Sequence, residues 1–179
     1  MLGAAFAPVA VVVVLAMLMR RQRADATRDA TGALTLEYGP AWRVLGVGVG
    51  ALWTALFVFM FIDSPPKPDD IPAMLLLIAL ATGTVVPYVL TVYGVAYRLD
   101  DGGIDRRSPW SKPLRVAWPD VTKVSYNATL AQFVLDTRRG RIRVGRLING
   151  MKDFRLAIER HVPAEARTAA SAQLATIQL

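Results

Sequence analysis

The chain has 179 residues, of which 54% are hydrophobic and 20% are charged, and its mean hydropathy is +0.36. Soluble globular domains are about 45–50% apolar even when glycine is counted, so this composition excludes an ordinary soluble domain. The absence of cysteine excludes disulfides and thiolate metal sites. The net charge is +7, and residues 1–97 hold six basic and six acidic side chains. A neutral, apolar first half therefore precedes a basic second half.

The first apolar segment, Leu2–Met19, is followed at once by Arg20, Arg21 and Arg23. About 18 apolar residues lie at the lower limit of what spans a bilayer. A cleaved signal peptide is the alternative, but signal peptides carry their positive charge before the apolar run. The order of charges favours a retained first helix, and the positive-inside rule predicts an N-terminus outside the cell.

Residues 20–41 are polar and are predicted to form a solvated cytoplasmic loop. Within this loop, the segment Leu34–Tyr38 alternates apolar and polar residues, which is typical of a strand. The alternative hypothesis is that this segment packs against the C-terminal domain, because both would lie on the same side of the membrane.

Two further apolar segments, residues 42–62 and 71–93, are predicted to span the membrane. Trp42 and Arg43 open the first of them, as expected at a cytoplasmic interface. The loop 63–70 between them holds one lysine and three aspartates, which is typical of a non-cytoplasmic loop. Residues 1–93 are therefore predicted to form a transmembrane region.

Each of these two segments carries a pair of small residues four positions apart, Gly46 with Gly50 and Ala79 with Gly83. Such pairs let another helix backbone approach closely, so they are candidate helix-packing sites. The glycines at 46, 48 and 50 superficially match a nucleotide-binding loop. No strand precedes them and no polar helix follows, so helix packing is the favoured interpretation.

The second half contains short runs with strand character, separated by turn residues such as Asp101-Gly102-Gly103. Asp-Gly and Gly-Gly supply the positive φ angles of tight hairpins. One amphipathic helix follows over 149–162, with Asn149 as its N-cap. The Ala-rich tail 163–179 permits either a helix or disorder. The predicted strands cover residues 95–99, 104–107, 114–118, 121–126, 133–137 and 142–144.

Three motifs carry a resemblance to a known family. They are Gly-Ile-x-x-Arg-Ser-Pro-Trp at 103–110, Trp-Pro-Asp-Val at 118–121 and Phe-Val-Leu-x-Thr-x-x-Gly at 133–140. In this order, before a closing helix, they resemble bacterial PH-like domains, which are commonly attached to membrane helices. The resemblance implies a strongly bent barrel of about seven strands over residues 94–162, plugged by one C-terminal helix. It implies a binding scaffold and no activity.

No set of residues in the sequence assembles a catalytic site. His161 is the only histidine, and its late position in an amphipathic helix favours a surface or helix-end side chain. One histidine without cysteines does not make a zinc site. No nucleophile elbow or phosphate-binding loop is present, and no charge lies in the middle of an apolar segment. We therefore predict a non-enzymatic protein without a cofactor or metal.

One concentrated cluster of charge stands out in the second half, and we call it the basic strip. Along a strand, alternate side chains point to opposite faces, so Arg139, Arg141 and Arg143 would share one face while Ile142 and Val144 point to the core. One interpretation is an edge strand protected by charge. The other is a strip that faces anionic lipid head groups at the cytoplasmic leaflet. Nucleic acid is disfavoured, because no aromatic residues alternate with the charges. The basic strip consists of Arg138, Arg139, Arg141, Arg143 and Arg146.

Two tryptophans of the second half are assigned different environments. Trp118 alternates with Val116 and Leu114, which predicts a core position. Trp110 lies between Pro109 and Ser111 in a turn, so we expect it to be exposed and to contact the membrane interface or a partner.

Together these features predict a multi-pass protein of the inner membrane with three transmembrane helices and a cytoplasmic PH-like domain. The predicted function is interaction with a protein or with the anionic lipid surface. The alternative is an accessory or structural subunit of a larger membrane complex that docks through the small-residue helix faces. Its partners would be the lipid bilayer, anionic head groups, and a protein partner or a second copy of the chain.

Overall fold

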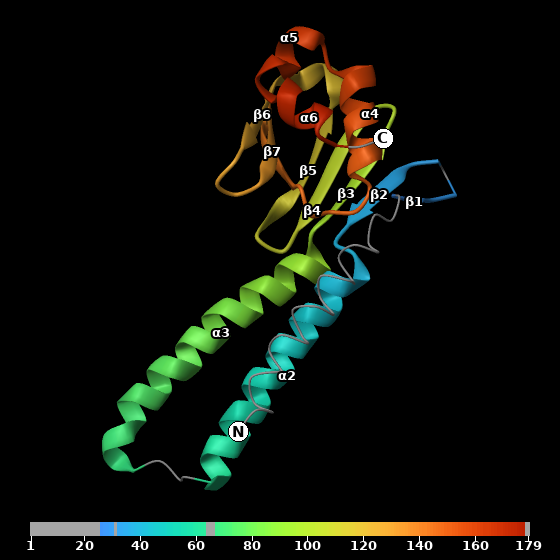
Figure 1. The fold of residues 1–179 in the computed structure, drawn as a ribbon. Coiled ribbons are helices and arrows are strands. Elements are labelled where there is room, and N and C mark those ends of the chain that lie inside the picture. The colour runs from blue at the N-terminus through green and yellow to red at the C-terminus, as the bar shows by residue number, and fades with distance from the viewer. Residues whose placement is uncertain (1–25, 31, 64–66, 178–179) are drawn as a thin grey trace.

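The computed structural model describes residues 26–30, 32–63 and 67–177 of the chain. Two long helices form a hairpin, and a domain of two small sheets and several short helices lies at the open end of this hairpin (Figure 1). The first predicted membrane segment, Leu2–Met19, lies outside the described residues.

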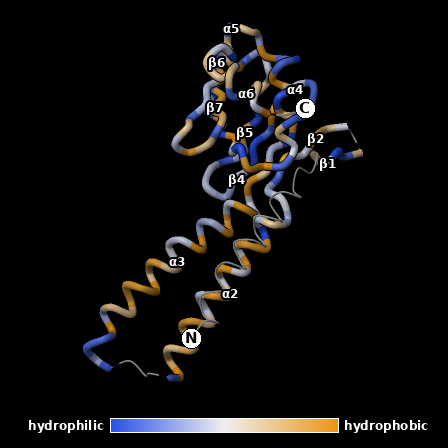
Figure 2. Tube along the Cα trace, in the orientation of Figure 1, coloured by the Kyte–Doolittle hydropathy of each residue, from blue (hydrophilic) through white to orange (hydrophobic). Residues whose placement is uncertain are grey.

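The two long helices are α2, Pro40–Asp63, and α3, Ile71–Gly94, and the short helix η1, Pro68–Asp70, leads into α3. Both have a mean hydropathy of 2.2 over their most apolar stretch, of which only 6% is buried. Apolar residues run along their whole length (Figure 2). They are therefore long and apolar enough to cross a membrane. The prediction of three membrane helices is wrong for the described residues, which contain two candidate spans.

The first sheet has five antiparallel strands in sequence order. Its second strand lies before α2 and α3 in the chain and pairs with the strand that follows them, so that Leu36 lies opposite Tyr97. The prediction of a solvated loop at this segment is therefore wrong, and the alternative that it packs on the domain is confirmed. The strands are β1 Thr27–Arg28, β2 Leu34–Glu37, β3 Ala96–Asp100, β4 Gly103–Ser108 and β5 Ser111–Ala117.

The second sheet has three antiparallel strands, β6 Val121–Asn127, β7 Gln132–Thr137 and β8 Gly140–Gly145. The short helix η2, Trp118–Asp120, connects the two sheets. All six strands predicted in this half are present, within a few residues at their ends. The predicted barrel is wrong, because the strands divide into two separate sheets and no ladder joins them within the described residues.

In a closed barrel, backbone hydrogen bonds would join β8 to a strand of the first sheet. Here side chains of the first sheet contact β8 instead. The free edge of β8 faces the first sheet, and its carbonyl groups accept hydrogen bonds from that sheet. The Tyr97 hydroxyl donates to the carbonyl of Arg143, and the Arg106 Nη1 donates to the carbonyl of Arg141 at 3.1 Å. Because these carbonyls are satisfied by side chains, no strand pairing is required at this edge.

The core lies between the two sheets and helix α4, Met151–His161. Trp118, Phe133 and Phe154 are among its largest fully buried side chains, so the predicted core position of Trp118 is confirmed. The helix begins after Gly150, whose φ of +80° is a left-handed conformation that favours glycine, and not after the predicted cap Asn149.

The tail after α4 is folded and packs on the core. It forms the short helices α5 Ala164–Arg167, η3 Thr168–Ala170 and α6 Ser171–Ala175. Ala170 and Leu174 are buried in the same cluster as the sheets. The prediction of one closing helix is therefore wrong, and so is the alternative of a disordered tail over its described part.

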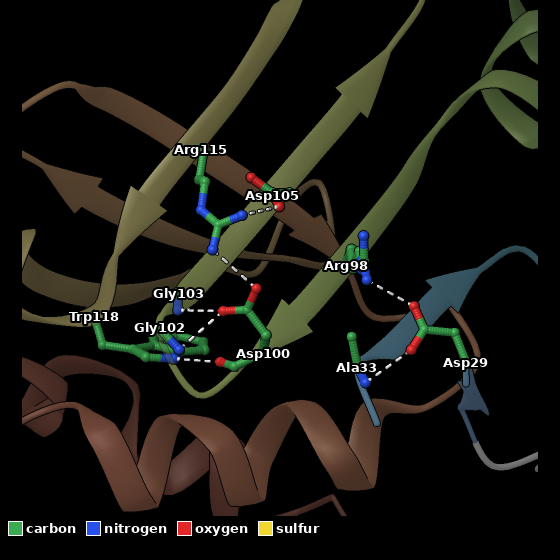
Figure 3. Close-up of polar contacts among 9 residues, drawn as sticks. All are labelled: Asp29, Ala33, Arg98, Asp100, Gly102, Gly103, Asp105, Arg115 and Trp118. Atoms are coloured by element: carbon green, nitrogen blue, oxygen red, sulfur yellow. Dashed lines mark hydrogen bonds and ion pairs between the residues drawn. The ribbon is translucent and has the colours of Figure 1, made fainter. Parts of the chain in front are cut away.

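Hydrogen bonds and an ion pair stabilise the β3–β4 turn of the first sheet (Figure 3). The Asp100 carboxylate accepts hydrogen bonds from the amides of Gly102 and Gly103, at 2.9 and 2.8 Å, and it pairs with Arg115 at 3.0 Å. The indole of Trp118 donates to the carbonyl of Asp100 at 2.9 Å. The β3–β4 turn is therefore held by the Asp100 side chain and by the indole of the buried Trp118.

Candidate functional site

Both long apolar helices, α2 and α3, enter the domain without a linker. Strand β2 ends at Glu37 and α2 begins at Pro40, while α3 ends at Gly94 and β3 begins at Ala96. Connections this short leave the domain no freedom to swing away from the helix ends. The domain surface beside these junctions is therefore the part of the molecule that a membrane around the helices would meet.

Side chains on the two helices and the first sheet close this junction. The Tyr88 hydroxyl donates to the carbonyl of Trp42 at 3.1 Å, and the Tyr93 hydroxyl donates to the carbonyl of Arg43 at 3.4 Å. The Arg43 guanidinium also pairs with Glu37 at 2.6 Å. Tyrosine and tryptophan are enriched where a membrane meets water, because each has an apolar ring and a polar end.

Tyr97, three residues beyond α3, connects this junction to the second sheet. Burial raises the pKa of the Tyr97 phenol to about 12, the nearby Tyr38 also raises it, and Arg106 lowers it. The phenol therefore keeps its proton at neutral pH and stays a donor to the carbonyl of Arg143. No sequence pattern indicated this role for Tyr97.

The β4–β5 turn rests on the last turns of α3. The Trp110 indole donates to the Thr91 hydroxyl at 3.0 Å. Gly94 allows this contact, because a Cβ at that position would lie 3.0 Å from the ring of Pro109. Trp110 is 55% exposed, as predicted for a residue in this turn. The turn thus places an exposed aromatic ring beside the end of α3, one of the two candidate membrane spans.

The basic strip lies on and around β8, the edge strand of the second sheet. Its arginines at 141 and 143 are exposed, whereas Ile142 and Val144 are fully buried, so the predicted alternation is confirmed. Arg139 lies before the strand, in the β7–β8 turn.

Two of the five arginines in the basic strip are neutralised within the domain. Arg141 pairs with Asp136 at 2.6 Å, and Arg139 lies 3.6 Å from Asp120. Arg146 donates to the Thr176 hydroxyl at 3.4 Å. Arg138 and Arg143 form no ion pair with any described residue and are exposed. The strip therefore offers less free charge than its sequence indicates, and most of it at Arg138, Arg143 and Arg146.

The end of the basic strip lies next to the start of α2. Tyr38, two residues before α2, forms an isolated bridge with Ile148. The Arg146 amide donates to the carbonyl of Ala131 at 2.9 Å, which places the β6–β7 turn beside the same end. Leu147 and, in the β6–β7 turn, Leu130 are 55% and 58% exposed, so apolar side chains accompany the charges on this side of the domain.

The two pairs of small residues in the helices face different ways. A Cβ at Gly46 would lie 3.0 Å from the ring of Tyr88, and one at Gly50 would lie 3.6 Å from Val85. The first pair therefore packs α2 against α3. Ala79 is exposed and a Cβ at Gly83 would meet no atom within 4 Å, so the second pair faces outward.

His161 ends α4 and stacks on Trp118, with ring centroids 5.5 Å apart and planes inclined by 8°. Its Nε2 lies 3.9 Å from a carboxylate oxygen of Asp101. No group of three histidine, aspartate or glutamate side chains among the described residues is placed to hold a metal ion. The contacts of His161 are those of a helix-end packing residue.

No family model matches the chain, and neither a curated protein nor a solved structure matches it. The resemblance to bacterial PH-like domains therefore stays a prediction from three short motifs.

Proposed function

We propose that this protein is a non-enzymatic integral membrane protein that holds a small folded domain against the cytoplasmic face of the membrane. There the domain interacts with a protein or with the anionic lipid surface. The observation that carries this proposal is the junction. Both helices enter the domain without a linker, and Trp110 bonds to Thr91 beside the end of α3. The membrane-side surface of the domain is thereby kept at the bilayer.

The charges support a cytoplasmic domain. Within about 20 residues of the helix ends, the loop between the helices has Lys67 as its basic residue, whereas the domain side has Arg28, Arg98, Arg106, Arg107 and Lys112. Basic segments stay on the cytoplasmic side of membranes. Cytoplasmic leaflets are negatively charged, and each basic residue at such a surface contributes up to about 1 kcal/mol. Because the domain is already anchored, this energy would orient it and not recruit it.

Topology is the first prediction of this proposal. The chain has no cysteine, so single cysteines at Lys67 and Ser171 give unambiguous labels, and both positions are exposed. With a membrane-impermeant maleimide on intact cells, we expect labelling at residue 67 and none at residue 171 until the cells are lysed. The opposite result would place the domain outside and contradict the lipid part of the proposal.

The basic strip supplies the second prediction. Arg138 and Arg143 have no ion-pair partner among the described residues, so their charges are available to anionic lipid. We expect that replacing both with glutamate abolishes the effect of anionic lipid on the orientation of the domain. The full chain is required, because β2 belongs to the domain. The measurement is energy transfer from a dye at a single cysteine replacing Thr129 to labelled lipid, in nanodiscs with and without phosphatidylglycerol.

Wild-type protein should show higher transfer efficiency in anionic nanodiscs, and the double reversal should show the same efficiency in both. The matched control reverses Lys123 and Arg160, two exposed residues without an ion pair among the described residues, and should behave as wild type. If wild-type transfer is independent of lipid charge, the basic strip does not orient the domain at the membrane.

The alternative function, a subunit of a larger membrane complex, is favoured by the outward-facing pair Ala79 and Gly83. Small residues on an open helix face allow another helix to pack closely. A stoichiometric partner that co-purifies in mild detergent supports this alternative, whereas a single monodisperse species counts against it.

A further inference from the structure

A groove of about 470 Å³ lies on the outer face of the first sheet, the face turned away from the core. Ala96 and Arg107, which pair across β3 and β4, line its end nearest the membrane helices together with Pro113. Ala96 is only two residues from the end of α3. The groove therefore begins at the level where the head groups of a surrounding bilayer would lie.

Among the described residues, Arg107 is an exposed cation without an ion pair at this end of the groove. Its neighbour Lys112 is also exposed and forms no ion pair with any described residue. The pairing of β4 with β5 shifts register at this point, so that Lys112 and Pro113 lie opposite the single residue Arg107. Such bulges re-aim side chains and recur beside functional sites.

The rest of the groove provides further polar groups and an apolar surface. Thr35 lines it from β2, and its hydroxyl has no hydrogen-bond partner among the described residues. Arg115 also lines the groove, but it is already paired with Asp100 and Asp105, at 3.0 and 3.2 Å. Exposed atoms of the lining are mostly apolar, with Pro113 and Leu114 among the contributing residues. A charged end beside the membrane and an apolar wall match a lipid head group and its glycerol.

We propose that this groove binds one anionic phospholipid of the leaflet beside the domain, with Arg107 contacting the phosphate and Thr35 donating a further hydrogen bond. Arginine binds phosphate through two parallel N–H groups, and this geometry favours it over a point charge. Lys112 adds attraction for the negative head group. The proposal rests on the proposed function, because the domain must lie at the bilayer, but it concerns a different surface from the basic strip.

The test is native mass spectrometry of the full-length protein in mild detergent, with phosphatidylglycerol, phosphatidylcholine or inorganic phosphate added. We expect wild type to retain one phosphatidylglycerol in preference to phosphatidylcholine. Arg107→Gln should weaken that retention about tenfold, because a charge-assisted contact is lost. The control Lys123→Gln removes an exposed charge on β6 and should retain the lipid like wild type.

Equal retention of the two lipids by wild type, or equal retention of phosphatidylglycerol by the Arg107 and Lys123 variants, would overturn the proposal. Displacement of the lipid by inorganic phosphate would also overturn it, since the groove would then select free phosphate. An unchanged melting temperature of Arg107→Gln excludes unfolding as the cause. Retention of the lipid by the Arg138 and Arg143 double reversal separates this site from the basic strip.

Discussion

Replacing Gly103 with alanine is expected to destabilise the domain by roughly 3 kcal/mol or more, the upper end of the cost of overpacking. Gly103 opens β4 and lies opposite Ala117 of β5. A Cβ at Gly103 would lie 2.1 Å from the carbonyl oxygen of Val116 and 2.9 Å from its carbon. Both are backbone atoms of the neighbouring strand, so no side chain can move to make room, and the two strands must separate.

The adjacent glycine provides a matched control. At Gly102 a Cβ would lie 3.2 Å from a carboxylate oxygen of Asp100, which is a side-chain atom that can shift. We expect Gly102→Ala to cost less than about 1 kcal/mol, because only a small adjustment is required. Thermal unfolding of the full chain in detergent, followed by circular dichroism, compares the two variants. Equal melting temperatures would show that β4 and β5 are not packed this closely.

Replacing Leu36 with alanine is expected to cost about 2–5 kcal/mol, as for other fully buried leucines. Leu36 is 0% exposed and belongs to the same core cluster as Phe154. It lies in β2, four residues before α2 in the chain. The loss in the free energy of unfolding therefore measures how much the segment before α2 contributes to the domain. The rest of the domain follows α3 in the chain.

Leu130→Ala is the control for this change. Leu130 lies in the β6–β7 turn and is 58% exposed, so its truncation leaves no cavity, and we expect a change within about 0.5 kcal/mol. Denaturant unfolding with tryptophan fluorescence provides the measurement, since Trp118 is buried in the same core. If the two variants have the same midpoint, the segment with Leu36 does not belong to the folded domain.

The two structural predictions describe a domain that is discontinuous in sequence. Strands β1 and β2 precede the helix hairpin, and the other strands of the described residues follow it. Because β2 pairs with β3, the chain returns to the sheet that it left before entering α2. A fragment that begins at residue 94 would lack Leu36 and expose the edge of β3, so functional tests require the full chain.

Local sequence was sufficient to predict the elements whose causes are local. The long apolar runs at 42–62 and 71–93 predicted α2 and α3, because few other structures satisfy the backbone of so apolar a segment. The turn residues Asp101-Gly102-Gly103 predicted the position of the β3–β4 hairpin correctly. The predicted positive φ angles were wrong, because neither Gly102 nor Gly103 has one. The turn is held instead by the Asp100 carboxylate, which accepts hydrogen bonds from both glycine amides. The alternation of apolar and basic residues around Ile142–Val144 predicted which side chains of β8 are buried and which are exposed.

The resemblance of three motifs predicted a barrel, and the strands form two sheets. The motifs determine turns and buried positions, whereas closure depends on what meets the free edge of β8. That edge is covered by the side chains of Tyr97 and Arg106, about 35 to 46 residues away in sequence. No short motif contains this information.

The sequence by itself determined the two apolar helices, the strands after them and the position of the basic residues. Only the tertiary structure decided that Leu36 completes the core, that Trp110 rests on α3 and that Asp136 and Asp120 neutralise part of the basic strip. The physical reason is the range of the interactions. Helix and turn formation depend on residues a few positions apart, whereas pairing and ion-pair contacts depend on which distant segments the fold brings together.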